Sequence, residues 1–338
     1  MTQLEQLVDS LLQPSEALIA DIAKLDGDII ILGVGGKIGP SLAKLLRQAI
    51  DRAGVQKRVI GVSRLTEPGL KEELESYGVE AIAADLLNDA ELQALPDVKN
   101  VLYLAGTKFG TTGKEAFTWA MNTYLPGRVA EKYKNSRIVV YSTGNVYPLT
   151  PVFAGGADEN VTPSPVGEYG QSCLGRERMF QHFSNKYGTP ILVYRLNYAN
   201  DLHYGVLLEI AKTVREEREL DVRMGHVNVI WQGDANEMAI RSLLQTSAPA
   251  KLLNITGPET APVRWIANEF GKIFNKKPIL VGEEQSTALL SNASESFRLF
   301  GYPKVTLLQM IQLTAAWLDA GGKMNNKDTH FQEREGKF

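Results

Sequence analysis

The first 26 residues carry apolar side chains at helical spacing. The pattern starts at Leu4 and runs to Leu12, Pro14 interrupts it, and a second apolar stripe continues to Leu25. Side chains three and four positions apart lie on one face of a helix, so the pattern predicts two short amphipathic helices divided at the proline. We expect residues 1–26 to form a helical extension that packs on the body of the protein or on a second subunit.

From Asp28 onward, short apolar runs alternate with amphipathic segments. Runs that are apolar at nearly every position are typical of strands covered by helices on both faces. Six such strands are predicted: 28–32, 58–62, 79–84, 100–105, 137–142 and 190–196. The segments predicted to be helices between them include 41–53, 114–134 and 169–187. Strands that alternate with helices predict a doubly wound parallel sheet of the α/β class, the Rossmann architecture.

Beyond residue 200 the alternation loosens. Amphipathic segments near 205–218, 234–246, 262–274 and 305–319 are separated by short apolar runs. Open α/β sheets bind ligands beyond the carboxyl ends of their strands, so a smaller α/β region packed there is the candidate substrate region. The chain is therefore predicted to contain a helical extension, a Rossmann domain, a substrate region with some segments returning to the Rossmann domain, and a polar tail: 1–26, 27–200, 201–320 and 321–338.

Composition and charge exclude several other classes of protein. The 338 residues are 44% apolar and 22% charged, with 39 acidic and 36 basic residues, so no basic excess favours a nucleic acid or an anionic membrane. The single cysteine excludes an intramolecular disulfide, and the four histidines lack the spacing of metal ligands. An acidic N-terminus and the lack of a long apolar run predict a cytoplasmic protein without membrane, nucleic-acid or metal partners.

A glycine-rich turn follows the first predicted strand. Residues 33–39 read Gly-Val-Gly-Gly-Lys-Ile-Gly, and a predicted helix begins directly after them. The backbone N–H groups of such a turn can approach a pyrophosphate, which then sits at the positive end of the helix. The order strand, glycine turn, helix, strand predicts dinucleotide binding. A Walker A loop is excluded, because Ile31 replaces its first glycine and Ile38 its Ser or Thr.

The end of the second strand bears on which dinucleotide binds. NAD sites usually end this strand with an acid that accepts hydrogen bonds from the ribose. Here Ser63 and Arg64 follow instead, and an arginine can pair with a 2′-phosphate. The sequence therefore favours NADP over NAD. An Arg64 that serves only as a surface charge would leave NAD as the cofactor.

Taken in order, these motifs resemble those of the extended short-chain dehydrogenase/reductase family, the NAD(P)-dependent sugar epimerases and dehydratases. The resemblance covers residues 27–320: the glycine turn fits the family's GxxGxxG, and 140–147 (VYSTGNVY) resembles its strand-five motif. It implies that Tyr169 is the catalytic acid–base, moving a proton to or from a substrate hydroxyl while a hydride passes to or from the nicotinamide. Thr143 would orient that hydroxyl.

The resemblance also implies which residues contact the ligands. Those expected to bind the cofactor are Gly33, Gly36, Lys37, Ile38, Gly39, Ser63, Arg64, Asp85, Leu86, Leu104, Ala105, Gly106, Asn122, Tyr141, Tyr169 and Leu196. Those expected to bind a small, carbohydrate-like substrate are Lys108, Thr143, Asn145 and Asn197. The family further implies a homodimer in which each subunit contributes two helices to the interface.

One position departs from the family's pattern. The family's active-site helix reads Tyr-x-x-x-Lys, and here Cys173 takes the place of the lysine. That lysine binds the nicotinamide ribose and its charge lowers the pKa of the tyrosine, which a neutral thiol does poorly. Arg176 or Lys108 could supply the charge instead; without either, Tyr169 is a poor base. A third alternative makes Cys173 a nucleophile.

Two functions from different classes follow. The leading hypothesis is an NAD(P)-dependent epimerase, dehydratase or oxidoreductase acting on a sugar, sugar-nucleotide or sugar-acid-like substrate. The alternative, motivated by the missing lysine, is a catalytically impaired dinucleotide-binding protein that acts as a sensor or scaffold. Residues 197–201 lack the family's usual YGP ending, which speaks against a standard nucleotide-sugar pocket.

Overall fold

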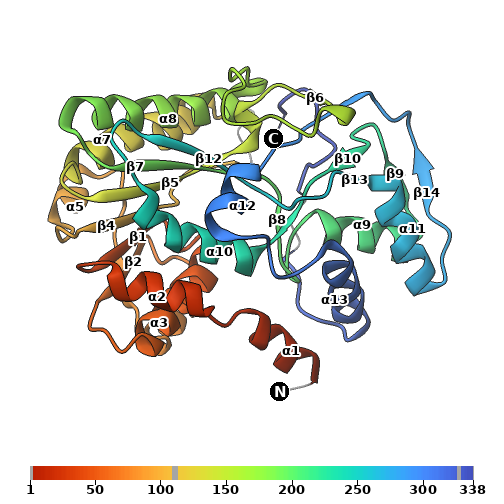
Figure 1. Ribbon diagram of the computed structural model, residues 1–338. Helices are drawn as coiled ribbons and strands as arrows, with labels where there is room; N and C mark the ends of the chain where they lie inside the picture. Colours follow the sequence, from red (N-terminus) through yellow and green to blue (C-terminus); the bar gives the residue numbers. More distant parts are fainter. Residues whose placement is uncertain (1–2, 109–112, 326–328, 338) are drawn as a thin grey trace.

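A seven-stranded parallel sheet forms the centre of the molecule (Figure 1). The computed structural model describes residues 3–108, 113–325 and 329–337. The strand order is β12–β7–β5–β4–β1–β2–β3, and all neighbours pair in parallel. The strands are β1 (Ile29–Leu32), β2 (Val59–Ser63), β3 (Glu80–Ala83), β4 (Asn100–Tyr103), β5 (Arg137–Thr143), β7 (Ile191–Leu196) and β12 (Lys251–Ile255). The predicted Rossmann architecture is confirmed.

Alternate residues of the central strand β1 face opposite layers of helices. Ile29 and Ile31 pack in one cluster with residues of α2 (Glu16–Lys24), α3 (Gly39–Arg52) and α10 (Gln232–Arg241). Ile30 and Leu32 pack in another cluster with α5 (Asp89–Ala94), α7 (Leu125–Lys132) and α8 (Gly167–Tyr187). All four side chains are fully buried. Burial on both faces explains why β1 is apolar at every position.

The carboxyl ends of the parallel strands bring distant residues to one edge of the sheet. Gly33 follows β1, Ser63 ends β2, Leu104 follows β4, Thr143 ends β5 and Leu196 ends β7. From β1 the order continues through β2 and β3, and from β4 it continues through β5, β7 and β12 on the other side. The position between β1 and β4 is therefore the switch point at which open α/β sheets bind ligands. This edge therefore positions the candidate site.

The segment predicted as one helix over 114–134 is divided by a π-helical turn. It consists of α6 (Glu115–Trp119), the π-helix η1 (Ala120–Tyr124) and α7. Pro126 lies in the first turn of α7 and has no N–H to donate to the carbonyl of Asn122, four residues earlier. The wide turn thus falls at Asn122, one of the predicted site residues.

A smaller α/β region lies beyond the carboxyl edge of the sheet (Figure 1, right). Its helices α9 (Val206–Arg215), α11 (Val263–Phe274) and α13 (Leu307–Asp319) enclose one apolar core. Short strands pair in and around this region as two-stranded sheets. They are β9 (Glu219–Asp221) with β14 (Ile279–Val281), β10 (His226–Val227) with β13 (Ala261–Pro262), β8 (Ala199–Asn200) with β11 (Ile230–Trp231), and β6 (Thr150–Pro151) with β15 (Thr287–Ala288).

The remaining helices cover the edges of these two cores. They are α1 (Gln3–Leu11), α4 (Leu70–Ser76) and α12 (Ser294–Phe300), with 3-10 turns η2 (Gly144–Val146), η3 (Val152–Ala154) and η4 (Ser242–Gln245). In the N-terminal extension, α1 packs against the smaller core and α2 against α3 and α10 of the main core. Among the helices of the described residues, none is long and apolar enough to cross a membrane.

The C-terminal tail crosses from the smaller region to the start of α8. Phe331 is fully buried in the smaller core. Arg334 donates to the carbonyl of Thr287 at 2.7 Å, and Gly336 lies so close to Val166 that an added Cβ would be 2.4 Å from that residue's carbonyl oxygen. The tail is thereby fixed against the helix that carries Tyr169.

Candidate active site

Two cavities meet at the loop that follows β4. The glycine-turn cavity is lined by Gly33, Gly35 and Gly36 and by the ends of β2 and β3. The Tyr169 cavity lies over the ends of β5 and β7 and the start of α8. Leu104, Gly106 and Thr107 line both cavities. An elongated ligand could therefore extend from one cavity into the other.

Glycines in the turn serve two different purposes. Gly33 has a φ of +94°, and an added Cβ would lie 2.6 Å from the backbone nitrogen of Ala105. At Gly39 the added Cβ would lie 2.0 Å from the carbonyl oxygen of Val34, so packing of the protein itself excludes a side chain at both positions. At Gly36 the nearest atom is 3.5 Å away. Its missing side chain instead leaves the turn open toward the cavity, as close approach of a pyrophosphate requires.

The predicted cofactor residues divide between the two cavities. Gly33, Gly36, Ser63, Arg64, Asp85, Leu86, Leu104, Ala105 and Gly106 line the glycine-turn cavity. The Tyr169 cavity is lined by Lys37, Ile38, Tyr141, Tyr169 and Leu196, together with Leu104 and Gly106. Gly39 and Asn122 line neither. Asn122 instead holds the shared loop, because its side chain accepts from the N–H of Thr107 at 2.9 Å and donates to the Thr107 carbonyl at 2.8 Å.

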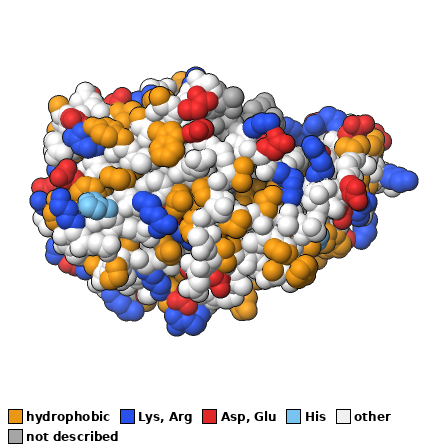
Figure 2. Space-filling model, turned by 90° about the horizontal axis from the view of Figure 1, so that it is seen from above, with side chains coloured by type: hydrophobic (Ala, Val, Ile, Leu, Met, Phe, Trp, Pro, Cys, Tyr) orange, Lys and Arg blue, Asp and Glu red, His pale blue; other side chains and the backbone are white. Residues whose placement is uncertain are grey.

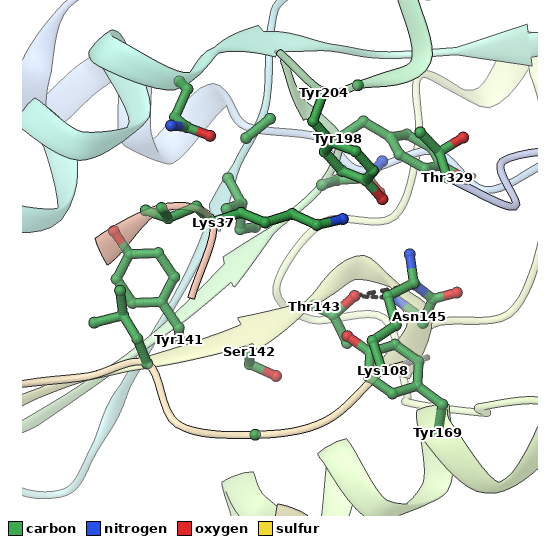
Figure 3. A pocket seen from close by; sticks show the side chains of 18 of the residues that line it. Lys37, Lys108, Tyr141, Ser142, Thr143, Asn145, Tyr169, Tyr198, Tyr204 and Thr329 are labelled. Carbon is green, nitrogen blue, oxygen red and sulfur yellow. Dashed lines mark hydrogen bonds between the residues drawn. The ribbon is translucent and has the colours of Figure 1, made fainter. Parts of the chain in front are cut away.

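Tyr169 and Thr143 face the same cavity from two elements (Figure 3). The Thr143 hydroxyl accepts hydrogen bonds from the backbone N–H and the side-chain amide of Asn145 at 3.2 and 3.0 Å. Burial raises the pKa of the Tyr169 phenol well above its ordinary value, and neither the charge of Arg176 nor a hydrogen bond with Thr143 offsets this rise. The phenol is therefore protonated near neutral pH, ready to donate a proton.

Cys173 is a packing residue rather than an exposed thiol. It is fully buried in a small apolar cluster with Val146, Tyr147 and Ala157. Burial raises the pKa of the thiol, and a buried neutral thiol is a poor nucleophile. Its position on α8 is one turn beyond Tyr169, so the helix presents sulfur where the sequence motif has an amine.

Both cations considered as substitutes for the lysine line the Tyr169 cavity. Arg176 is buried on α8, where it donates to the carbonyl of Tyr141 at 2.7 Å and to the side-chain oxygen of Asn122 at 2.8 Å. Lys108 extends from the shared loop, and its amine lies 5.8 Å from the centre of the Tyr169 ring. Burial lowers the pKa of Lys108 to about 8. The charge of Arg176 lowers the pKa of Tyr169, against the larger effect of burial.

Comparison with known proteins identifies the family. The sequence profile described as the NAD dependent epimerase/dehydratase family matches residues 29–201, more than half of the chain. The chain belongs to this family. Membership assigns it to the NAD-dependent enzymes of the epimerase/dehydratase type and confirms the resemblance found in the sequence. No curated protein matches the chain.

Solved structures of similar fold include three epimerases. The UDP-glucuronic acid 4-epimerase of Bacillus cereus with NAD is 20% identical, with a TM-score of 0.70, covering 86% of this chain and 96% of that one. The Thermus thermophilus UDP-glucose 4-epimerase with NAD is 18% identical, with a TM-score of 0.69 and coverage of 86% and 98%. The UDP-glucose 4-epimerase of Thermotoga maritima with UDP-glucose is 17% identical, with a TM-score of 0.68 and coverage of 87% and 99%.

A buried ion pair fixes α8 of this epimerase/dehydratase-family protein to its sheet. Glu177 of α8 accepts two hydrogen bonds from Arg195 of β7, at 3.0 and 2.7 Å, and one from the hydroxyl of Ser142 at 2.6 Å. Arg195 also donates to the hydroxyl of Tyr147 at 2.6 Å. These contacts hold α8 against β5 and β7 and so fix Tyr169 relative to Thr143.

Sequence reasoning missed several residues that line the Tyr169 cavity. Tyr198, Tyr204, Gln232 and Thr329 all lie there, although they come from four separate segments after β7. The amine of Lys37 lies over the ring of Tyr204, 3.0 Å from its centre, so this side chain points away from the glycine-turn cavity. The predicted substrate residues Lys108, Asn145 and Asn197 lie in the same cavity. No local pattern marks Tyr204 or Thr329, because only the fold of the smaller region brings them here.

Proposed function

We propose that this chain is an NAD(P)-dependent enzyme that oxidises, reduces or epimerises a hydroxyl-bearing carbon of a sugar or sugar nucleotide. The observation that carries the proposal is the placement of Tyr169 and Thr143 in one cavity that joins the glycine-turn cavity. The three similar structures support the sugar-nucleotide class, since they are UDP-glucose and UDP-glucuronic acid 4-epimerases.

The residues present fit a nicotinamide dinucleotide. The open turn at Gly36 leads into the first turn of α3, where a pyrophosphate would meet the positive helix end. Two residues that line the Tyr169 cavity carry buried donors without hydrogen-bond partners among the described residues, Arg176 Nε and Tyr141 Oη. Unpaired buried donors favour a polar ligand. A bound nicotinamide would supply hydride transfer at this site.

Proton movement is assigned to Tyr169 and its positioning to the residues around it. In reduction, Tyr169 Oη gives its proton to a carbonyl oxygen of the substrate while Thr143 Oγ1 holds the same oxygen. In oxidation, the ionised phenol takes the hydroxyl proton. Arg176, through its fixed charge, favours that ionised state. An epimerase would use both directions in turn on one carbon.

Calorimetric titration with NAD⁺, NADH, NADP⁺ and NADPH tests the first requirement of this proposal. We expect tight binding of one pair, and the presence of Arg64 in the glycine-turn cavity favours the phosphorylated one. An Arg64→Ala variant should then lose affinity for NADP(H) by about tenfold while keeping its affinity for NAD(H). Absence of binding for all four nucleotides, with none co-purified, would overturn the proposal.

Activity is tested by incubating the loaded protein with UDP-glucose and UDP-glucuronate. Epimerisation is followed by chromatography of the products, and net hydride transfer by the absorbance of reduced nicotinamide. Tyr169→Phe is the matched control, because it removes one oxygen and retains the ring. We expect turnover in the wild type and loss of about 100-fold or more in the variant.

A second candidate is a dinucleotide-binding sensor or scaffold, favoured by the presence of Cys173 instead of lysine. The variant Cys173→Lys separates the two functions. Turnover by the wild type with only a modest gain in the variant supports the enzyme. Hydride transfer by the variant alone supports the sensor. Because the lysine would enter a fully buried position, thermal unfolding must confirm that the variant folds.

We also propose a homodimer formed through the helices on the outer face of the sheet. A mostly apolar groove there is lined by Trp119, Tyr124, Met179 and Phe183 of η1, α6 and α8. The view of Figure 2, from above, shows hydrophobic side chains scattered among lysines, arginines and acids over this side of the molecule. Light scattering of the wild type should give twice the chain mass, and Tyr124→Asp should give a monomer.

A further inference from the structure

The C-terminal tail forms part of the wall of the Tyr169 cavity. We call residues 329–337 the strap. Thr329, at its start, is buried and lines the cavity (Figure 3). At its other end the strap lies against the start of α8, where an added Cβ on Gly167 would be 2.3 Å from the carbonyl oxygen of Gly336. The strap therefore leads from the cavity wall to the helix that carries Tyr169.

The carboxylate of Glu209 on α9 is the first anchor of the strap. It accepts hydrogen bonds from the backbone N–H and the hydroxyl of Thr329, at 2.8 and 2.5 Å, and from the side-chain amide of Gln332 at 3.3 Å. The Thr329 hydroxyl also accepts from the N–H of Phe331 at 3.2 Å. Because this hydroxyl already donates its proton to Glu209, Thr329 contributes to the cavity mainly by its position.

Two further side chains fix the strap. Phe331 is fully buried in the apolar core of the smaller region. Arg334 donates to the carbonyl and to the hydroxyl of Thr287 in β15, at 2.7 Å in both cases. A short segment that is held by one buried aromatic ring and a few hydrogen bonds opens at a lower free-energy cost than the helices it joins. Changes at these anchors should therefore loosen the strap before they affect the sheet.

Tyr198 connects the strap to the cavity. It lines the Tyr169 cavity, its side chain packs against the core that contains Phe331, and its hydroxyl donates to the carbonyl of Phe331 at 3.5 Å. The φ of Tyr198 is +45°, which residues with a side chain rarely adopt. Such a conformation persists only where the surrounding structure fixes it. Phe331 is one of the groups that do so.

The strap also fixes a charge near the cavity. Burial lowers the pKa of Lys108, which lines the cavity, to about 8, and the negative charge of Glu209 opposes this effect. The same charge adds to the effect of burial that raises the pKa of Tyr198. Since Thr329 and Gln332 hold the Glu209 carboxylate, the strap determines where this charge lies.

We propose that the strap positions the wall of the cavity that a sugar nucleotide contacts, with Phe331 and Thr329 as the positioning residues. Phe331 acts through Tyr198, and Thr329 acts through Glu209. This inference rests on the proposed function, because it assumes that a sugar nucleotide enters the Tyr169 cavity. Among the residues that the structure describes, none of the strap lines the glycine-turn cavity. Loosening the strap should thus weaken binding of the sugar nucleotide and leave dinucleotide affinity unchanged.

The test uses the full chain saturated with the dinucleotide that it binds. Calorimetry measures the affinity for UDP-glucose and for UDP-glucuronate, and initial rates give kcat and KM for the probe that turns over. In Phe331→Leu we expect affinity to fall and KM to rise by about tenfold, with kcat changed by less than about twofold. Thr329→Val removes the hydroxyl, retains the shape and leaves the apolar core intact, and should weaken binding by about threefold or more.

Phe270→Leu is the matched control for Phe331→Leu. Phe270 lies on α11 and is fully buried in the same core, but it is not one of the residues that line the Tyr169 cavity. Both variants should lower the urea midpoint to a similar extent. Only Phe331→Leu should lose affinity for the sugar nucleotide, because only Phe331 belongs to the strap.

A double-mutant cycle tests the route through Tyr198. Tyr198→Ala is measured alone and together with Phe331→Leu. If Phe331 acts through Tyr198, the loss caused by Phe331→Leu should nearly disappear once Tyr198 is replaced. Independent, additive losses would show that the strap does not act through this residue.

Each remaining outcome decides between the two proposals. Equal loss of affinity in Phe331→Leu and Phe270→Leu, unchanged affinity in both strap variants, or absence of binding of either UDP-sugar to the dinucleotide-saturated wild type would overturn this inference. Normal dinucleotide binding in those cases leaves the dinucleotide-dependent function standing. Absence of dinucleotide binding would overturn the proposed function and this inference with it.

Discussion

The guanidinium of Arg176 donates a hydrogen bond to the side-chain oxygen of Asn122 at 2.8 Å. The same Asn122 holds the backbone of Thr107, so one pair of residues connects α8 to the loop between the two cavities. Gly106 has no side chain because an added Cβ would lie 2.2 Å from Arg176 Nη2. A buried cation thus lies on α8 two turns beyond Tyr169.

Replacement of Arg176 should change the pH profile as well as stability. In Arg176→Met, the charge that lowers the pKa of Tyr169 is lost, so the rise of oxidation rate with pH should move to higher pH. We expect a loss of about 2–4 kcal/mol in the free energy of unfolding, because two buried acceptors each lose a hydrogen bond. Urea unfolding and a pH–rate profile measure the two effects.

Arg178→Met is the control for this variant, since Arg178 is exposed on the same helix. Arg176→Lys retains the charge and should recover much of the wild-type pH profile. A profile unchanged in Arg176→Met would show that this residue acts in packing alone.

The two directions of hydride transfer should depend differently on pH. Because burial raises the pKa of Tyr169, the phenol is protonated below about pH 10. Reduction of a ketone needs the protonated phenol and should be nearly independent of pH from about 6 to 9, while oxidation should accelerate throughout that range. Initial rates in both directions test this. An oxidation rate that levels off near neutral pH would mean that a cation in the loaded enzyme lowers this pKa strongly.

The single cysteine should resist modification in the folded protein. Cys173 is fully buried and burial raises the pKa of its thiol, so a thiol reagent can react only after local or global opening. Labelling with a chromogenic disulfide should be slow in buffer and fast in denaturant. Rapid reaction of the native protein would contradict the buried position and restore a reactive role for this residue.

Breaking the ion pair between Glu177 and Arg195 should destabilise the protein strongly. Both side chains are almost fully buried, and removing one partner leaves the other charge unpaired, at a cost of about 3–5 kcal/mol. Glu177→Gln should therefore lower the urea midpoint far more than Glu269→Gln, which alters a pair with an exposed lysine. The double variant Glu177→Leu with Arg195→Met should recover part of the loss, since no buried charge remains.

The fold was predictable because its strands and helices differ in local pattern. The four isoleucine and leucine residues of β1 are buried on both faces, and this leaves a continuous apolar run that any sequence reader can find. By contrast, β12 lies within the predicted region 201–320, of which some unnamed segments were expected to return to the Rossmann domain. Its pairing with β7 places it in the main sheet, and such a pairing depends on a partner more than fifty residues away. The short helices α4 and α5 were missed as well.

The sequence by itself determined the order of the motifs. The glycine turn follows β1, Thr143 ends β5 and Tyr169 lies in the first turn of α8, and these elements form from local periodicity. The tertiary structure alone decided the direction of Lys37 toward Tyr204, the burial of Cys173 and the contact of Arg176 with Asn122. The physical reason is that periodicity fixes which face of an element is buried, whereas the charge around a site depends on side chains from elements far apart in the chain.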